Sequence, residues 1–383
     1  MKVRLFKWLL TVTAFLCMTL VATSVFAKKP TDTGPKDDSC TGLETPDVAF
    51  WRDSRTTGKN RMAQVSIYVA QSDNGCEAKL IDIPLPEGPI NELKLAFSSV
   101  VVNGEFLGRV IWLRSMADDA RGVWKYDFTV NNGIVQGAGE EKMFLKTESY
   151  RNQNISYLDL SPDGQLLVYG LWKNGDPDPD NIISIRTINI ADCLGTNFPC
   201  AFDAGTEIYT IVDTPDTPVA FRSPVWGPFG ERIYFIENEN DAVRIMMVDA
   251  TDPSPVSLMT IGNDIGFVRE VSSGIGYSLD GDTEYLAVTI GIFDWAGIVI
   301  HGCREIFTLD VVDCLNSEGA SCDLQHETAG THPSWNRAGK LIHTSQGLEL
   351  KNPTNCAINT IGTWDGSNLE TLGKGYEPEA AGG

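Results

Sequence analysis

The chain has 383 residues and a formal net charge of −21, with 51 acidic against 30 basic residues. An acidic surface repels phosphate backbones and anionic lipids, which argues against nucleic acid as a partner and favours a protein or a small neutral or cationic ligand. Hydrophobic residues make up 42% of the sequence, enough for a large core, and the 36 glycines and 19 prolines are typical of a chain with many turns.

The first 27 residues have the pattern of a secretory signal peptide. Lys2, Arg4 and Lys7 provide a basic start, an apolar stretch follows, and Val25-Phe26-Ala27 matches the small or apolar residues of a cleavage site. We expect cleavage after Ala27 and a periplasmic or secreted mature protein with a net charge of −24 and no membrane span. An uncleaved membrane anchor is the alternative, because the apolar run has nearly the length of a short span.

Strands are predicted from residue 47 onward, after an N-terminal linker over residues 28–46, because polar and apolar residues alternate there. The first two groups of strands are predicted at Asp47–Arg52, Ala63–Ala70 and Ala78–Ile83, and at Leu93–Phe97, Phe106–Arg114, Gly122–Thr129 and Ile134–Leu145. Further groups are predicted over residues 155–212, 218–261, 271–329 and 332–373. Residues 375–383 are too few for another group, so we expect them to supply the missing innermost strand of the first.

A repeated hairpin marks four of these groups. Gly164, Gly230, Gly281 and Gly339 each follow a large apolar residue by four positions and precede an apolar run. The pattern is typical of strand, tight turn and strand, in which glycine takes the positive φ that the turn needs. The spacings of 66, 51 and 58 residues leave room for two more strands in each unit.

Four antiparallel strands repeated at this period predict the blades of a β-propeller. Blades that pack on one another bury both faces of each sheet, and closure of the ring removes the exposed ends. We therefore expect an all-β, six-bladed β-propeller of four-stranded antiparallel blades that occupies residues 47–383 as a single domain. Seven blades are the alternative for the count. An array of β-sandwiches is the alternative for the fold, but it does not explain the recurring hairpin.

Three segments resemble the TolB-like propeller repeat, namely Leu160-Ser161-Pro162-Asp163-Gly164, Ser334-Trp335-Asn336-Arg337-Ala338-Gly339 and Asp365-Gly366-Ser367-Asn368-Leu369. The usual form of that repeat is Trp-Ser-Pro-Asp-Gly before a strand and Asp-Gly-Ser-Asn-Leu in the outer hairpin. Phe229 and Ala338 stand where the repeat has Asp. The resemblance covers about residues 155–373 and implies a propeller of the bacterial cell envelope. We expect the propeller alone, because only about 20 residues separate Ala27 from the first strand, too few for the α/β domain of TolB proteins.

Eight cysteines remain after Cys17, which lies in the signal peptide. An even number after an export signal predicts disulfides, and the zinc alternative lacks the paired Cys-x-x-Cys spacing. Two cysteines occupy the same place in two groups, each with a second cysteine seven or eight residues later, so each pair is expected to close an outer loop. The expected pairs are Cys193–Cys200 and Cys314–Cys322, followed by Cys40–Cys76 and Cys303–Cys356.

The sequence contains no Gly-x-Ser-x-Gly elbow, no His-Glu-x-x-His, no phosphate loop and no dinucleotide fingerprint, so no catalytic residue and no cofactor is predicted from a motif. Asp176, Asp178 and Asp180 place three carboxylates in one loop, which is a calcium candidate, with a solvated acidic loop as the alternative. His326 and His332 are the alternative metal candidates, because some propeller lyases hold a metal with histidines in the channel. Packing within the repeat is the simpler explanation of both.

Two classes of function remain open. The favoured one is an exported, non-catalytic binding or scaffold propeller of the cell envelope that contacts a protein or another ligand through its loop faces. The alternative is a metal-dependent lyase or hydrolase that acts on a carbohydrate or peptide in the channel. Convergence of three or more histidines and carboxylates on the axis would favour the enzyme, whereas a channel lined by alanine, serine and apolar residues would favour the binding protein.

Overall fold

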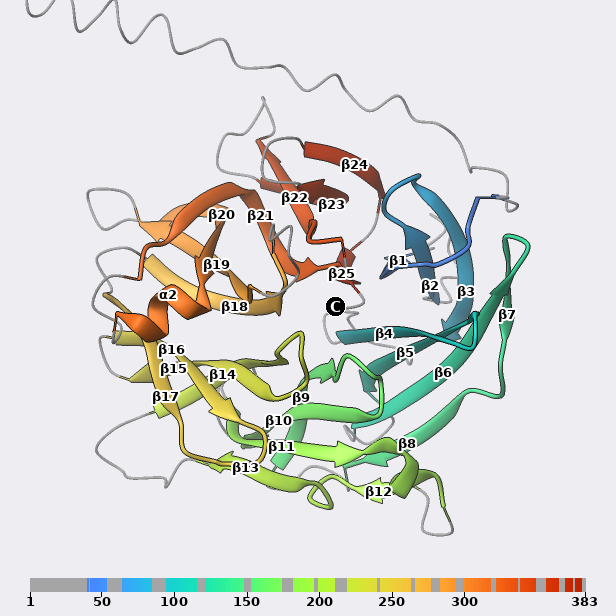
Figure 1. Ribbon diagram of the computed structural model, residues 1–383, viewed down its shortest axis with the longest axis horizontal. Coiled ribbons are helices and arrows are strands. Elements are labelled where there is room, and N and C mark those ends of the chain that lie inside the picture. The colour runs from blue at the N-terminus through green and yellow to red at the C-terminus, as the bar shows by residue number, and fades with distance from the viewer. Residues whose placement is uncertain are drawn as a thin grey trace, which may run out of the picture. The chain divides into compact units, whose positions relative to one another are not determined.

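The structure is a computed structural model, and it describes residues 40, 42–53, 64–84, 94–115, 121–147, 153–173, 182–195, 199–210, 219–239, 242–262, 266–276, 283–293, 299–317, 322–336, 338–348, 356–364, 369–374 and 376–380. Ser39–Gly383 forms one compact unit. Within it, antiparallel strands form successive sheets whose inner strands surround a common axis (Figure 1).

The first sheet joins strands from both ends of the described chain. β1 (Val48–Asp53), β2 (Gln64–Gln71) and β3 (Cys76–Pro84) form an antiparallel meander. β25 (Tyr376–Ala380) pairs antiparallel with β1 on its other side and contacts β4 and β21. The prediction that residues 375–383 supply the innermost strand of the first group is therefore confirmed.

The other strands follow in chain order. The second group comprises β4 (Lys94–Val102), β5 (Glu105–Ser115), β6 (Arg121–Asn131), β7 (Ile134–Gly137) and β8 (Lys142–Lys146). The third group comprises β9 (Gln153–Leu160), β10 (Leu166–Lys173), β11 (Ile182–Asn189), β12 (Cys200–Ala201) and β13 (Thr206–Thr210). The fourth group comprises β14 (Val219–Trp226), β15 (Arg232–Glu239), β16 (Ala242–Asp249) and β17 (Val256–Gly262). The fifth comprises β18 (Gly266–Gly274), β19 (Tyr285–Phe293) and β20 (Val299–Asp310). The sixth comprises β21 (Gln325–Trp335), β22 (Leu341–Leu348), β23 (Cys356–Trp364) and β24 (Leu369–Lys374). The number of blades stays a prediction.

Two boundaries differ from the sequence-based expectation. The single strand expected over Ile134–Leu145 is two strands, β7 and β8, which both pair with β6. Gly139 lies between them with a φ of 149°, so the backbone leaves the extended conformation there. The border expected between residues 329 and 332 lies inside β21, whose first half pairs with β20 and whose second half pairs with β22.

Two short helical turns follow the third strands of two groups. η2 (Ile190–Leu194) begins after Asn189, whose side chain accepts a hydrogen bond from the N–H of Ala191. α2 (Val311–Asn316) begins after Asp310, whose side chain accepts from two N–H groups of the first turn. Both are N-caps of the usual residue types, so local sequence explains why the chain turns at these points.

Disulfides close both helical turns. The structure contains Cys193–Cys200 and Cys314–Cys322, and it joins Cys40 to Cys76. The first two are the pairs that the short spacing predicts, and Cys40–Cys76 is the first of the two further pairs expected. The side chains of Cys303 and Cys356 lie outside the described ones, so that pair stays a prediction.

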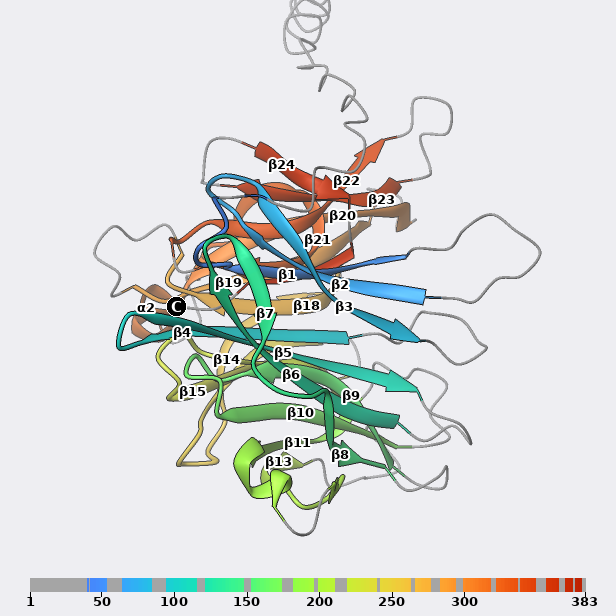
Figure 2. The same ribbon diagram turned by 90° about the vertical axis from the view of Figure 1, so that its right-hand side faces the viewer.

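The core lies between neighbouring sheets. Val48 and Phe50 of β1 pack with Ile342 of β22, and Ala287 of β19 packs with Trp335 of β21. Consecutive inner strands β4, β9, β14, β18 and β21 contact one another, and β25 contacts both the last and the first of them. The turned view shows the first two groups side by side, with β3 next to β7 (Figure 2). Each sheet therefore buries its faces against its neighbours, as in a β-propeller.

Candidate functional site

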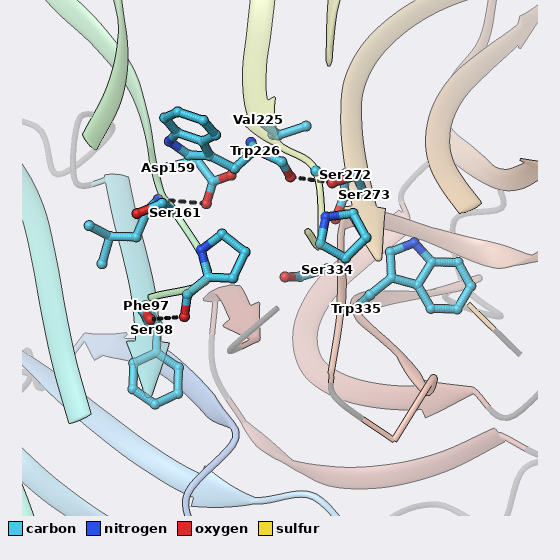
Figure 3. Close-up of a pocket in the computed structure, with 14 residues that line it drawn as sticks. Phe97, Ser98, Asp159, Ser161, Val225, Trp226, Ser272, Ser273, Ser334 and Trp335 are labelled. Carbon is cyan, nitrogen blue, oxygen red and sulfur yellow. Dashed lines mark hydrogen bonds between the residues drawn. The ribbon is translucent and has the colours of Figure 1, made fainter. Parts of the chain in front are cut away.

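The inner strands end in a cavity on the axis, which we call the serine funnel (Figure 3). The space inside it that water can occupy is about 40 Å³, which is room for a small polar group. Five serines, two tryptophans and one carboxyl group contribute to its lining. These residues are Ser98, Asp159, Ser161, Trp226, Ser272, Ser273, Ser334 and Trp335.

Hydroxyl groups of the funnel tie neighbouring inner strands together. Ser98 Oγ of β4 donates to the carbonyl of Pro162, which follows β9, at 3.0 Å. Ser273 Oγ of β18 donates to the carbonyl of Trp226 at the end of β14. These bonds satisfy buried carbonyls and fix the spacing of the strands around the axis.

Asp159 of β9 is the one carboxylate in the described lining of the funnel. Its Oδ2 accepts from the N–H of Trp226 at 2.7 Å, and its Oδ1 accepts from the N–H of Leu160 at 2.8 Å. Burial raises the pKa of Asp159 to about 7, although the two N–H groups act in the opposite direction. The carboxyl group is therefore close to half ionised at neutral pH.

Sequence analysis did not single out Asp159. The available signal was an acidic residue between the apolar Leu158 and Leu160, in a strand that immediately precedes the repeated turn. Alternation alone assigns such a residue to a solvated face. The structure places it on the axis because its strand is an inner one.

A second pocket lies earlier along the same inner strands. Its polar lining includes one residue from each of five strands: Lys94, Tyr157, Ser223, Glu270 and His332. Asp159 contributes to both pockets. The two pockets are therefore successive parts of one axial passage.

The backbone of the second pocket is strained at three matching positions. Tyr157, Ser223 and His332 have φ values of 51°, 49° and 51°, which side-chain-bearing residues seldom adopt. Each lies where the pairing of its inner strand shifts register. Such bulges redirect side chains, and strain of this kind is typical of functional sites.

Glu270 joins β18 to β21 in this second pocket. Its Oε2 accepts from Thr331 Oγ1 and from the backbone N–H of His332, both at 2.8 Å. Its Oε1 lies 3.3 Å from His332 Nε2 and 3.6 Å from an Arg304 nitrogen. Burial alone would raise the pKa of Glu270, but the charges of His332, Arg304 and Lys94 outweigh it and lower the pKa to about 2.

The structure does not bring the predicted metal candidates together. His326 lies 2.9 Å from Glu305 on an outer strand and is 55% exposed, whereas His332 lines the axial passage. Among the described residues, no group of three His, Cys, Asp or Glu side chains could hold a metal ion. The three aspartates of the calcium candidate lie outside the described residues, namely Asp176, Asp178 and Asp180.

No helix in the described part of the chain is long and apolar enough to cross a membrane.

His343, the remaining histidine whose side chain the structure describes, is fully buried on β22. Burial lowers its pKa to about 4.

Solved structures share this fold at low sequence identity. TolB from Acinetobacter baumannii superposes with a TM-score of 0.52 and 13% identity, over 88% of this chain and 66% of that chain. A chain of the nidogen/laminin complex has a TM-score of 0.48 and 11% identity, and the match covers 88% of this chain and 98% of that chain. Putative TolB from Agrobacterium tumefaciens has a TM-score of 0.46 and 13% identity, and the match covers 81% of this chain and 90% of that chain. No protein-family model matches the chain, and no curated protein matches it either. This chain spans about two thirds of the length of the Acinetobacter protein.

Proposed function

The chain has the fold of a TolB-like β-propeller, and on that premise we propose that it is an exported, non-catalytic binding protein of the bacterial cell envelope. The likeness concerns the fold, so the role is argued from the site. The observation that carries the proposal is the lining of the serine funnel: hydroxyl groups, aromatic rings and one carboxyl group at the end of the axial passage.

The state of the serines favours binding over acyl transfer. A serine nucleophile needs a base that accepts its proton. Ser98 and Ser273 donate to backbone carbonyls, which cannot act as bases. These hydroxyl groups are thus arranged to hold the rim in place.

The surroundings of the funnel support a rigid contact face. The N–H of Ile190 donates to the carbonyl of Gln165, and the N–H of Val311 donates to that of Glu284. These bonds hold the disulfide-closed turns η2 and α2 beside the turns that follow inner strands. A preorganised loop face lowers the entropy that is lost when a partner binds.

Export is the second part of the proposal. Disulfides persist in oxidising compartments, and three of them join described residues. N-terminal sequencing of the protein recovered from the envelope or the medium should begin at Lys28. A retained Met1 would contradict export by signal cleavage.

A capture experiment tests the binding role. The mature protein is immobilised and exposed to its own envelope extract, beside a Ser272→Tyr variant that fills the funnel and a Ser254→Tyr variant on an exposed turn. The wild-type protein and Ser254→Tyr should retain the same protein, and Ser272→Tyr, once shown to be folded, should not. Equal capture by all three would refute the funnel as the contact site.

The metal content of the same purified sample tests the lyase or hydrolase alternative. A stoichiometric transition metal, together with turnover of a polysaccharide that is lost in His332→Ala, would replace the binding role with chemistry in the channel.

A further inference from the structure

We propose that the serine funnel receives an organic cation with several N–H donors, such as a lysine ammonium or an arginine guanidinium, and that Asp159 is its counter-ion. The inference rests on the proposed binding function and names the chemistry of the ligand. It follows from which hydrogen-bonding groups of the funnel are already used and which remain.

Three of the five serine hydroxyl groups of the funnel, those of Ser98, Ser161 and Ser273, already use their protons. A serine hydroxyl has one proton and two lone pairs. Ser98 and Ser273 give their protons to the carbonyls of Pro162 and Trp226, which can only accept, so the direction of both bonds is unambiguous. Ser161 gives its proton to a carboxylate of its own turn. The free positions on these oxygens therefore suit a ligand that donates.

Four positions of the turns at the rim offer no free backbone N–H group. Pro162 and Pro228 have no backbone N–H. The N–H of Gly164 donates to the carbonyl of Ser161, and the N–H of Gly227 donates to the carbonyl of Arg232. At these positions an anion would meet no free N–H group, whereas an ammonium or guanidinium group would meet acceptors.

Asp159 supplies the charge that such a ligand needs. Of the described residues, its carboxylate contacts two backbone N–H groups, and no described cationic side chain acts on it. The nearest charged groups along the passage belong to the second pocket. There Glu270 lies between His332 and Arg304, and the charge of Lys94 also helps to lower its pKa. Among the described residues Asp159 has no ionic partner, so a cation in the funnel would supply one, and the net charge of −21 attracts cations over longer distances.

The second pocket does not offer the same match. Its carboxylate, Glu270, already has ionic and hydrogen-bonding partners, and the Ser223 hydroxyl both donates to and accepts from the backbone of Val271. A guest cation there would compete with cations of the protein itself. The funnel, with Asp159 at its inner end, is the better site for a positive group.

Calorimetry with a matched pair of peptides tests the inference. The probes are acetyl-Gly-Arg-Gly-amide and the same peptide with citrulline, which keeps the shape and loses the charge. The arginine peptide should bind wild-type protein, with the citrulline peptide at least about tenfold weaker. With the pKa of Asp159 near 7, the affinity should rise about tenfold from pH 6 to pH 8, because only the ionised carboxylate pairs with the cation.

Three variants identify the group responsible. Asp159→Asn should weaken binding at pH 8 at least about tenfold and remove the pH dependence. Glu140→Gln removes one exposed negative charge outside the funnel and should leave both unchanged. His332→Gln changes a side chain of the second pocket, and binding to this variant should keep its pH dependence. If Asp159→Asn fails to fold, the two peptides and the pH series on the wild-type protein still decide the question.

Two further probes separate the sources of the cation. If spermidine binds more tightly than the arginine peptide, and Asp159→Asn weakens its binding, the site belongs to a free polyamine. This result would still support an organic cation as the ligand. Calcium that binds through Asp159 and excludes the peptide would overturn it, as would equal affinity for the arginine and citrulline peptides. The Ser272→Tyr variant could lose partner capture while the wild-type protein binds neither peptide. That result would leave the binding role intact and refute only the proposed cationic ligand.

Discussion

Asp159 should make the protein less stable as the pH rises from about 4 to 7, and Asp159→Asn should remove that loss. The pKa of this carboxyl group is near 3.8 in the unfolded chain and about 7 in the folded one. Between these values the folded state holds a proton that the unfolded state has released, so the free energy of unfolding falls as the pH rises and levels off above pH 7.

The magnitude follows from the shift. About three pKa units at about 1.4 kcal/mol each correspond to about 4 kcal/mol. This is an upper limit, because the side chain keeps part of its exposure to the funnel, where solvent reduces the cost of charge burial.

Asparagine adds an offset that does not depend on pH. Its side-chain oxygen can replace one of the two acceptor atoms, but its NH₂ group then faces the N–H of Leu160 or Trp226. One unsatisfied N–H costs about 1–3 kcal/mol. Asp159→Asn should therefore be the less stable protein at pH 4, and the difference should shrink or reverse by pH 8.

Urea unfolding followed by tryptophan fluorescence at intervals from pH 4 to pH 8 measures this effect. Guanidinium is unsuitable because it is a cation of the class proposed for the funnel. The difference between the wild-type and Asp159→Asn curves isolates one group, and Glu140→Gln controls for the loss of an exposed charge. Parallel wild-type and Asp159→Asn curves would refute the assignment of a buried, near-neutral carboxyl group.

Burial lowers the pKa of His343 to about 4, so the unfolded state takes up a proton first and stability should fall by up to about 3 kcal/mol as the pH drops from about 6.5 to 4. The difference between the wild-type and His343→Leu stability curves from urea unfolding should show this fall, whereas parallel curves would contradict burial. Replacing Cys314 and Cys322 with serine should cost about 2–3 kcal/mol in urea unfolding, since the closed loop is short. Deleting residues 375–383 removes β25 and should lower the melting temperature sharply, whereas deleting 381–383 leaves β25 in place and serves as the control.

The strands, turns and short disulfides could be predicted from the sequence because each depends on residues close together in the chain. Alternation predicted β1, β2 and β3 within one or two residues at most ends. Gly164 and Gly339 have the positive φ expected of the repeated turn. Cys193 and Cys200 are seven positions apart, so a disulfide between them closes a short loop that local sequence can predict. Local geometry of this kind, repeated along the chain, was sufficient to indicate a propeller.

The properties of the site were decided by residues that are distant in sequence. The pKa of Asp159 depends on its burial on the axis and on the N–H of Trp226, 67 residues later. The proton of Ser98 is used by a carbonyl 64 residues away. A sequence pattern shows that a residue can ionise or donate, but the neighbours that set its pKa and use its protons come from other strands. Only the closed ring of strands brings those neighbours together, so the chemistry of the funnel is a property of the tertiary structure.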